Sequence, residues 1–171
     1  SGHGVATCQD ALDCARSFQG AAAYLDPPYN QHNYRANYHV WETLIRFDEP
    51  EVYGVVRKRA DCRQEKSDFN SKRRISDALT AVIAALDVPR LVLSFSDEGF
   101  LSREQLEQML SERGHVATVA MEHKRYVGAQ IGIYNPQGRS VGKVSHLRNQ
   151  ELIYIVDPDA DRARAGAARI K

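Results

Sequence analysis

Asp26-Pro27-Pro28-Tyr29 is the segment whose residue types best suit chemistry. The carboxylate of Asp26 and the carbonyl of Pro27 can each accept one hydrogen of an amino group, while the Tyr29 ring can stack on a planar base. The two prolines fix the backbone, so both acceptors are held ready without ordering on binding. An aromatic amine is a poor nucleophile because its lone pair is delocalised, and acceptors that polarise it in the transition state promote its attack. A stiff turn after a strand is the plain alternative for Asp26–Tyr29.

The elements around this corner predict an α/β fold. The apolar run over residues 21–26 predicts a buried strand that ends at Asp26, and Leu91–Phe95, 116–122 and 152–156 predict three more strands. Helices are predicted around residues 38–45, over 75–86, and after Ser102, where Ser102 and Gln105 can form a capping box. The polar, basic residues 56–74 predict a surface loop. The element order predicts a sheet that is parallel except for its antiparallel last strand.

Such a sheet binds ligands at the carboxyl ends of its strands, which is where Asp26 lies. With 171 residues and 43% hydrophobic content, we expect one compact unit over residues 1–156 and a polar tail over 157–171 that is a frayed helix or disordered.

Charge and cysteine usage exclude several classes of protein. The formal net charge is +1, so contact with a nucleic acid has to come from a local basic patch. The three cysteines are odd in number and lack the spacing of zinc ligands, which favours free thiols in a reducing cytoplasm and no metal site. No apolar run reaches the length of a membrane span. We therefore expect a cytoplasmic protein with no membrane and no metal partner.

Asp26–Tyr29 is similar to the catalytic signature of amino-directed DNA methyltransferases. The resemblance covers roughly residues 7–156 and is to the adenine-N6 branch related to the Dam methylases. Besides the corner, the segments that carry it, in order, are Tyr29-Asn30-Gln31, Tyr34, Asn37-Tyr38-His39, Glu42-Thr43, Phe69-Asn70-Ser71-Lys72 and Ser94-Phe95-Ser96-Asp97-Glu98-Gly99.

This resemblance implies a site-specific enzyme that transfers a methyl group from S-adenosylmethionine to N6 of adenine in DNA, as restriction-modification systems do. The target base is expected to be flipped from the duplex. The implied fold is a partial Rossmann-like S-adenosylmethionine-dependent methyltransferase sheet. Because in-line methyl transfer needs alignment more than acid or base, we expect neither a metal nor a protein nucleophile.

The resemblance also implies roles for single residues. Asp26, Pro27, Pro28 and Tyr29 are the expected catalytic residues. Asp10, Ala11 and Asp26 are the expected cofactor-binding residues, with Asp13 as a rival to Asp10. The expected DNA-binding residues are Asn30, Tyr34, Tyr38, Lys72, Lys124, Arg125 and Tyr126, although Lys72 also suits a solvated helical face and Tyr126 simple packing.

The resembling enzymes carry a glycine-rich cofactor loop and a target-recognition region before the catalytic strand, where this sequence has about two dozen residues. We therefore expect a fragment that is inactive alone, whose missing N-terminal half or second polypeptide brings that loop. One alternative is an N4-cytosine or RNA amino-methyltransferase, whose sites are similar. Another is a non-catalytic remnant or a subunit of a split enzyme.

Overall fold

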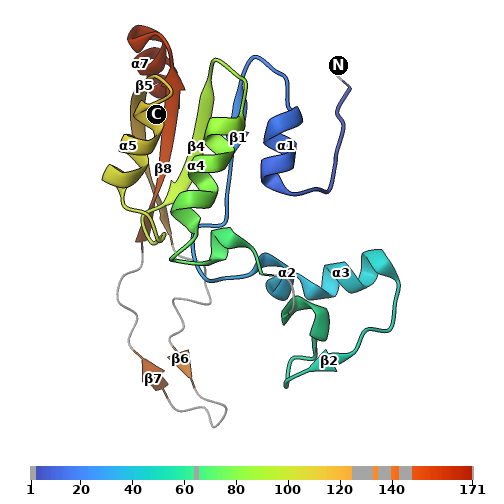
Figure 1. Ribbon diagram of the computed structural model, residues 1–171. Helices are drawn as coiled ribbons and strands as arrows, with labels where there is room; N and C mark the ends of the chain where they lie inside the picture. Colours follow the sequence, from blue (N-terminus) through green and yellow to red (C-terminus); the bar gives the residue numbers. More distant parts are fainter. Residues whose placement is uncertain (1–2, 64–65, 125–132, 135–139, 143–147, 171) are drawn as a thin grey trace. The chain divides into compact units, whose positions relative to one another are not determined.

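The computed structural model describes residues 3–63, 66–124, 133–134, 140–142 and 148–170 (Figure 1). They form two compact units. The first comprises Ser1–Gln19 and Pro27–Asp87, and the second comprises Gly20–Asp26 and Val88–Lys171. The chain therefore crosses from one unit to the other between Asp26 and Pro27, inside the predicted catalytic corner.

The second unit is built on a four-stranded sheet with the order β1-β4-β8-β5. Its strands are β1 (Ala23–Leu25), β4 (Leu91–Ser96), β5 (His115–Lys124) and β8 (Arg148–Asp157). β1 pairs with β4 in parallel, while β8 is antiparallel to both of its neighbours, β4 and β5. β1, β4 and β5 thus run in one direction, which confirms the predicted sheet, parallel except for its last strand.

Local sequence signals explain why α5 (Arg103–Ser111) forms where it does. The Ser102 side chain accepts a hydrogen bond from the Gln105 backbone, and the Gln105 side chain accepts one from the Ser102 backbone, which completes the predicted capping box. Leu101 before the cap and Leu106 within the helix are both buried. α5 contacts β5 and β8, where Leu106 and Leu110 add to a core that includes Tyr154.

The C-terminal residues, for which we expected a frayed helix or disorder, are helical. Asp157 ends β8, and Asp159 caps α7 (Ala160–Ala168) by accepting hydrogen bonds from the backbones of Asp161 and Arg162. α7 contacts β5 and β8, and Ala163 on this helix is buried. Helix packing in the second unit therefore continues past residue 156.

The first unit is mainly helical, with α1 (Ala11–Ser17) packed against α4 (Ile75–Ala85). Between them lie α2 (Tyr34–Asn37) and α3 (His39–Arg46), then β2 (Val52–Tyr53) paired with β3 (Lys58–Arg59), and the 3₁₀ turns η1 (Ala60–Arg63) and η2 (Asp68–Asn70). The prediction of a surface loop over residues 56–74 is therefore wrong where β3 and η1 form, because Arg59 and Cys62 in these elements are buried. The predicted helices at 38–45 and 75–86 are confirmed as α3 and α4.

The sequence Asn135-Pro136-Gln137-Gly138 predicts a turn and a hairpin-like return before the last strand, which the structure describes only in part. β6 (Ile133–Tyr134) pairs with β7 (Ser140–Gly142) in an antiparallel ribbon. The turn expected at residues 135–138 lies outside the described residues.

Candidate active site

Asp26 lies directly after β1 and is exposed to solvent. The parallel register pairs Leu25 with Leu93, so the next residue on each strand brings Asp26 level with Ser94. The Ser94 hydroxyl donates a hydrogen bond of 3.0 Å to Oδ1 of Asp26, and its oxygen also lies 2.9 Å from the hydroxyl of Tyr24. Because Ser94 is buried, the adjacent strand supplies a fixed partner that orients the Asp26 carboxylate.

The segment after Asp26 is held by its own side chains and by η2. Pro27, Pro28 and Tyr29 are half-buried. The Asn70 side chain donates to the backbone carbonyls of Asn30 at 2.8 Å and of His32 at 3.1 Å. These two bonds link η2 to the loop that follows Tyr29, so the position of that loop depends on Asn70.

The loop also uses the side chain of Asn30, which we expected to bind DNA. Its Oδ1 accepts a hydrogen bond from the backbone of His32 at 2.9 Å. Asn33 begins α2 in a similar way, since its Oδ1 accepts from the backbone of Arg35 at 2.9 Å. Two side chains thus shape the connection between Tyr29 and α2.

Two aromatic residues with expected DNA contacts form a stacked pair in the first unit. The ring centroids of Tyr34 and Tyr38 are 6.2 Å apart, and the ring planes differ by 14°. About half of each residue is exposed, at 48% for Tyr34 and 56% for Tyr38. The pair therefore offers an open aromatic face beside the segment that follows the corner.

Of the remaining residues expected to contact DNA, the structure describes Lys72 and Lys124. Lys72 is exposed in the turn before α4. Lys124 is the last residue of β5, and Arg148 is its register partner on the antiparallel strand β8. Arg125 and Tyr126 lie outside the described residues.

Asp10 and Ala11, the expected cofactor-binding pair, lie at the start of α1 on the wall of a cavity of about 960 Å³. Oδ1 of Asp10 caps the helix by accepting from the backbone of Leu12 at 2.9 Å and from that of Asp13 at 3.4 Å. Phe69 lies on the same wall. The volume is in the range of small-molecule sites.

The rival carboxylate Asp13 does not line this cavity. It forms an ion pair of 3.2 Å with Arg16, and both side chains are mostly exposed. Of the two carboxylates, Asp10 is therefore the one that lines the cavity. Sequence reasoning assigned no role to Phe69 or Ser94, although both stand in segments that carry the family resemblance.

The strongest electrostatic feature is a network around the buried Arg59. Its guanidinium donates to both carboxylate oxygens of Asp48, at 2.6 and 2.8 Å, and to Asp61 at 2.9 Å. These hydrogen bonds lower the pKa of Asp48 and of Asp61 and raise the pKa of Arg59. Arg46 joins Asp61, at 3.3 Å, to Glu42, at 2.7 Å. The network connects α3 to β3 and η1, which is a structural role.

Cys62, next to this network, is not a reactive thiol. Burial is the main cause that raises the pKa of its thiol, and the sulfur donates to the carbonyl of Arg35 at 3.4 Å. A raised pKa keeps a thiol protonated at neutral pH.

No three side chains of His, Cys, Asp or Glu gather as metal ligands in the described ranges. Among the helices in those same ranges, none combines the length and apolar character needed to cross a bilayer.

Comparison with known proteins gives matches of one kind. The family model for the D12 class N6 adenine-specific DNA methyltransferase matches residues 6–109. The type II methyltransferase M.FokI of Planomicrobium okeanokoites is 33% identical over 106 residues, which are 62% of this chain and 16% of that protein. The modification methylase StsI of Streptococcus sanguinis is 31% identical over 104 residues, 61% of this chain and 16% of that protein.

A third relative covers more of the chain. The type II methyltransferase M.NlaIII of Neisseria lactamica is 27% identical over 138 residues, 81% of this chain and 40% of that protein. The matched part of the chain thus spans less than half the length of each of these relatives. No solved structure matches the chain.

Proposed function

The chain belongs to the D12 class of N6 adenine-specific DNA methyltransferases, and on this premise we propose that it carries the amine-activating site of such an enzyme. The reaction is site-specific transfer of a methyl group from S-adenosylmethionine to N6 of adenine in DNA. The observation that carries the proposal is the exposed Asp26 carboxylate, held by Ser94 at the end of a parallel strand and followed by Pro27, Pro28 and Tyr29. We extend the proposal to the fold, a partial Rossmann-like methyltransferase sheet.

The chemistry follows from the two acceptors of the corner. With adenine flipped out and stacked on Tyr29, the Asp26 carboxylate and the Pro27 carbonyl accept the two N6 hydrogens. S-adenosylmethionine supplies a methyl group whose bond to the sulfonium breaks as the bond to N6 forms. Positive charge then develops on the nitrogen, where the carboxylate stabilises it, and one N6 proton leaves to solvent. Ser94 keeps the carboxylate aimed at the amine throughout.

The cavity beside Asp10 is the proposed place for the adenosine part of the methyl donor. The Asp10 oxygen that does not cap α1 is a hydrogen-bond acceptor for a ribose hydroxyl or an amino group. Ala11 adds a small apolar contact, and Phe69 is an aromatic surface for the adenine ring. Tyr34, Tyr38 and Lys72 are proposed DNA contacts, together with Asn30, Lys124, Arg125 and Tyr126.

Replacement of the carboxylate tests this proposal. In the natural protein, Asp26→Ala is expected to lower methyl transfer to DNA by about 10²-fold or more, the scale of losing a preorganised group that stabilises charge. The measurement is transfer of labelled methyl from S-adenosylmethionine, with mass spectrometry of the nucleosides. Glu112→Ala, at an exposed position after α5, is the control and is expected to keep full activity.

Nucleoside analysis separates the substrates. N6-methyladenine in DNA supports the proposal, while N4-methylcytosine or methylated RNA as the product would replace it. An Asp26→Ala protein with unchanged activity would remove the corner from the mechanism.

A further inference from the structure

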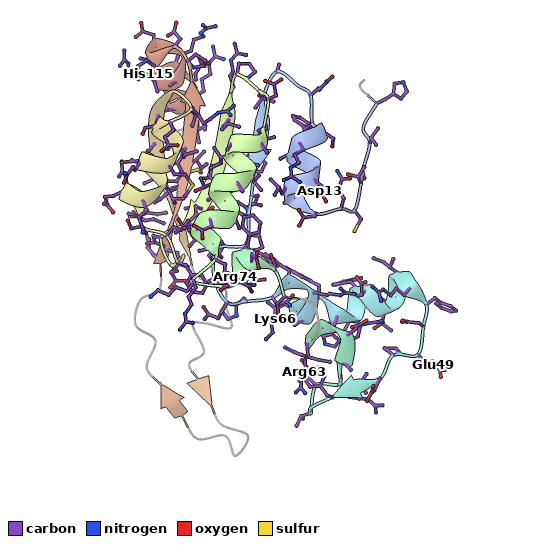
Figure 2. The ribbon with its side chains drawn as sticks, viewed as in Figure 1. Asp13, Glu49, Arg63, Lys66, Arg74 and His115 are labelled. Atoms are coloured by element: carbon purple, nitrogen blue, oxygen red, sulfur yellow. The ribbon has the colours of Figure 1, made fainter. Side chains whose placement is uncertain are left out.

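The first unit contains another cavity, of about 640 Å³, whose lining is strongly basic. Three cationic side chains contribute to it: Arg63 at the end of η1, Lys66 before η2 and Arg74 before α4 (Figure 2). Ser67, Asn70 and Ser71 add neutral hydrogen-bonding groups. Among the described residues that line this cavity, none is acidic. We call it the anion pocket.

The positive charge of the anion pocket is only partly neutralised. Nη1 of Arg74 lies 2.9 Å from a carboxylate oxygen of Asp68, but both side chains are more than half exposed, so the pair is weak. The Arg63 guanidinium lies 3.6 Å above the centre of the Tyr53 ring, which orients the cation without cancelling its charge. Lys66 forms no ion pair in the described part of the chain.

Asn70 connects the anion pocket to the loop that follows the catalytic corner. It lines the pocket, and its side chain donates to the carbonyls of Asn30 and His32. A base stacked on Tyr29 is attached to a sugar-phosphate backbone, so a phosphate is the anion that accompanies the substrate to this loop. Guanidinium, ammonium and hydroxyl groups are the usual partners of DNA phosphates.

We propose that the anion pocket binds a backbone phosphate of the DNA strand that carries the target adenine. The inference rests on the proposed function, since it takes DNA as the substrate. It assigns Arg63, Lys66 and Arg74 to phosphate contacts that fix the strand while Tyr29 and Asp26 hold the base. The methionine carboxylate of the methyl donor is the competing anion, because Lys66 and Ser67 also line the cavity beside Asp10.

Salt dependence of DNA binding tests the pocket directly. Each phosphate contact adds about 0.9 to the slope of log affinity against log salt concentration. Lys66→Gln and Arg63→Gln in the full chain are each expected to weaken binding to a labelled DNA duplex and to make this slope shallower, by at most about 0.9 because the two cations share one phosphate. Arg169→Gln removes the same charge from an exposed position after α7 and is expected to leave the slope unchanged.

The outcomes separate this inference from the proposed function. Wild-type slopes in both pocket variants, with normal DNA binding by the parent chain, would overturn the pocket and leave the function standing. An equal loss in Arg169→Gln would show that overall charge is responsible and would also overturn it. A parent chain that binds no DNA at low salt would contradict the phosphate assignment, whereas the proposed function is tested separately by the nucleoside analysis of the natural protein.

Titration with S-adenosylmethionine distinguishes the two anions. If Arg63→Gln weakens binding of the methyl donor and leaves the DNA slope intact, the anion is the donor's carboxylate and the phosphate assignment is wrong. Unchanged donor affinity with a shallower DNA slope supports it.

Discussion

Asp26 owes its orientation to one hydroxyl on the adjacent strand. Ser94 is buried in β4, while Asp26 is exposed at the end of β1, and the parallel register brings them to 3.0 Å. A buried donor aimed at an exposed carboxylate restricts its rotation and leaves its second oxygen available for substrate. The same hydroxyl group lies 2.9 Å from Tyr24, so three side chains from two strands form one short chain of contacts.

Loss of the Ser94 hydroxyl is expected to slow the reaction without preventing binding. Ser94→Ala is expected to lower kcat by about 3- to 10-fold, the equivalent of one hydrogen bond worth roughly 1 kcal/mol. KM for S-adenosylmethionine is expected to change by less than kcat, because the Asp10 cavity is unaltered and Asp26 keeps its carboxylate. Steady-state kinetics measures both, and Ser96→Ala on the same strand is the matched control. Equal effects of the two substitutions would assign Ser94 to packing alone.

Asn70 is expected to position the loop after Tyr29. Asn70→Leu keeps a similar size but removes both donations to the carbonyls of Asn30 and His32. We expect it to lower the free energy of unfolding by about 1–2 kcal/mol and to reduce methyl transfer, since the half-buried carbonyl of Asn30 and the exposed carbonyl of His32 lose their donor. Urea denaturation measures the first effect, and Gln108→Leu at an exposed site on α5 is the control. An unchanged rate would show that the loop keeps its place without Asn70.

The corner proposed as catalytic could be singled out from sequence, whereas the residues that position it could not. Asp26–Tyr29 combines a carboxylate, two prolines and a ring in consecutive positions, so its chemistry is local. Ser94 acquires its role only through the pairing of β1 with β4, and Asn70 only through contacts with carbonyls 38 and 40 residues earlier. Such long-range pairs leave no periodic signal in a single sequence.

At the scale of the elements, burial separates two helices with similar sequence signals. Apolar spacing predicted both α3 and α5. Leu106 on α5 is fully buried, whereas Ile45 on α3 is 82% exposed. Trp41 and Leu44 on α3 are also mostly exposed. The apolar spacing therefore predicted where a helix forms and did not predict which helix face becomes buried.

This contrast makes a stability prediction. Leu106→Ala is expected to lower the free energy of unfolding by about 2–5 kcal/mol, because it leaves a cavity in the core of the second unit. Ile45→Ala is expected to change it by less than about 0.5 kcal/mol, as exposed substitutions do. Chemical denaturation of both variants checks the pair, and a large loss for Ile45→Ala would mean that this helix face is covered in solution.

The carboxylates around Arg59 are expected to make the first unit sensitive to acid. The pKa of Asp48 and of Asp61 is lower in the folded protein than in the unfolded chain, chiefly through hydrogen bonds from Arg59. Their stabilisation is therefore present above the unfolded pKa of about 4 and is lost as the pH falls through the lower folded values.

Thermal unfolding measured from pH 7 down to pH 3 checks this expectation. The melting temperature of the parent chain is expected to fall as the carboxylates are protonated. The Asp48→Asn variant is expected to have a lower melting temperature than the parent at pH 7 and a smaller decrease as the pH falls. The control Asp161→Asn on α7 is expected to show the same decrease as the parent. Parallel curves for the parent and Asp48→Asn would contradict the assigned role of the network.

The same network explains why residues 56–74 were misjudged as a surface loop. Arg59 is polar by composition, but its guanidinium is paired with Asp48 and Asp61, so it can be buried. The capping box of α5, in contrast, lies within four residues and was recognised from sequence. The capping-box residues form a known sequence pattern, whereas no sequence pattern marks the pairing of Arg59 with Asp48, eleven residues earlier.

At the scale of the whole molecule, positive charge is distributed unevenly. The formal net charge of +1 gives no general attraction to DNA. The anion pocket collects three cations with no acidic residue in its described lining. Affinity for DNA is thus expected to depend on a few cationic positions. Single substitutions at these positions are therefore expected to change the affinity measurably.

The division of the chain into two compact units was not predicted from its length and composition. Chain length favoured a single compact body, but α1 packs on α4 and thereby joins the start of the chain to residues 27–87. The directions of the four strands, in contrast, followed from the sequence of elements. The insertion of β8 between β4 and β5 and the long-range helix pairing that defines the first unit were not predicted.

The position of β8 constrains how the second unit is made in the cell. This strand, the last of the sheet to be synthesised, fills the place between β4 and β5. β4 and β5 therefore leave the ribosome before β8, the strand that pairs with both of them. Until β8 is made, the strand edges that it will cover are unpaired, and such edges are prone to aggregation. Completion of the sheet must wait for residues 148–157, so β4, the strand that carries Ser94, gains its second neighbour only at a late stage of synthesis.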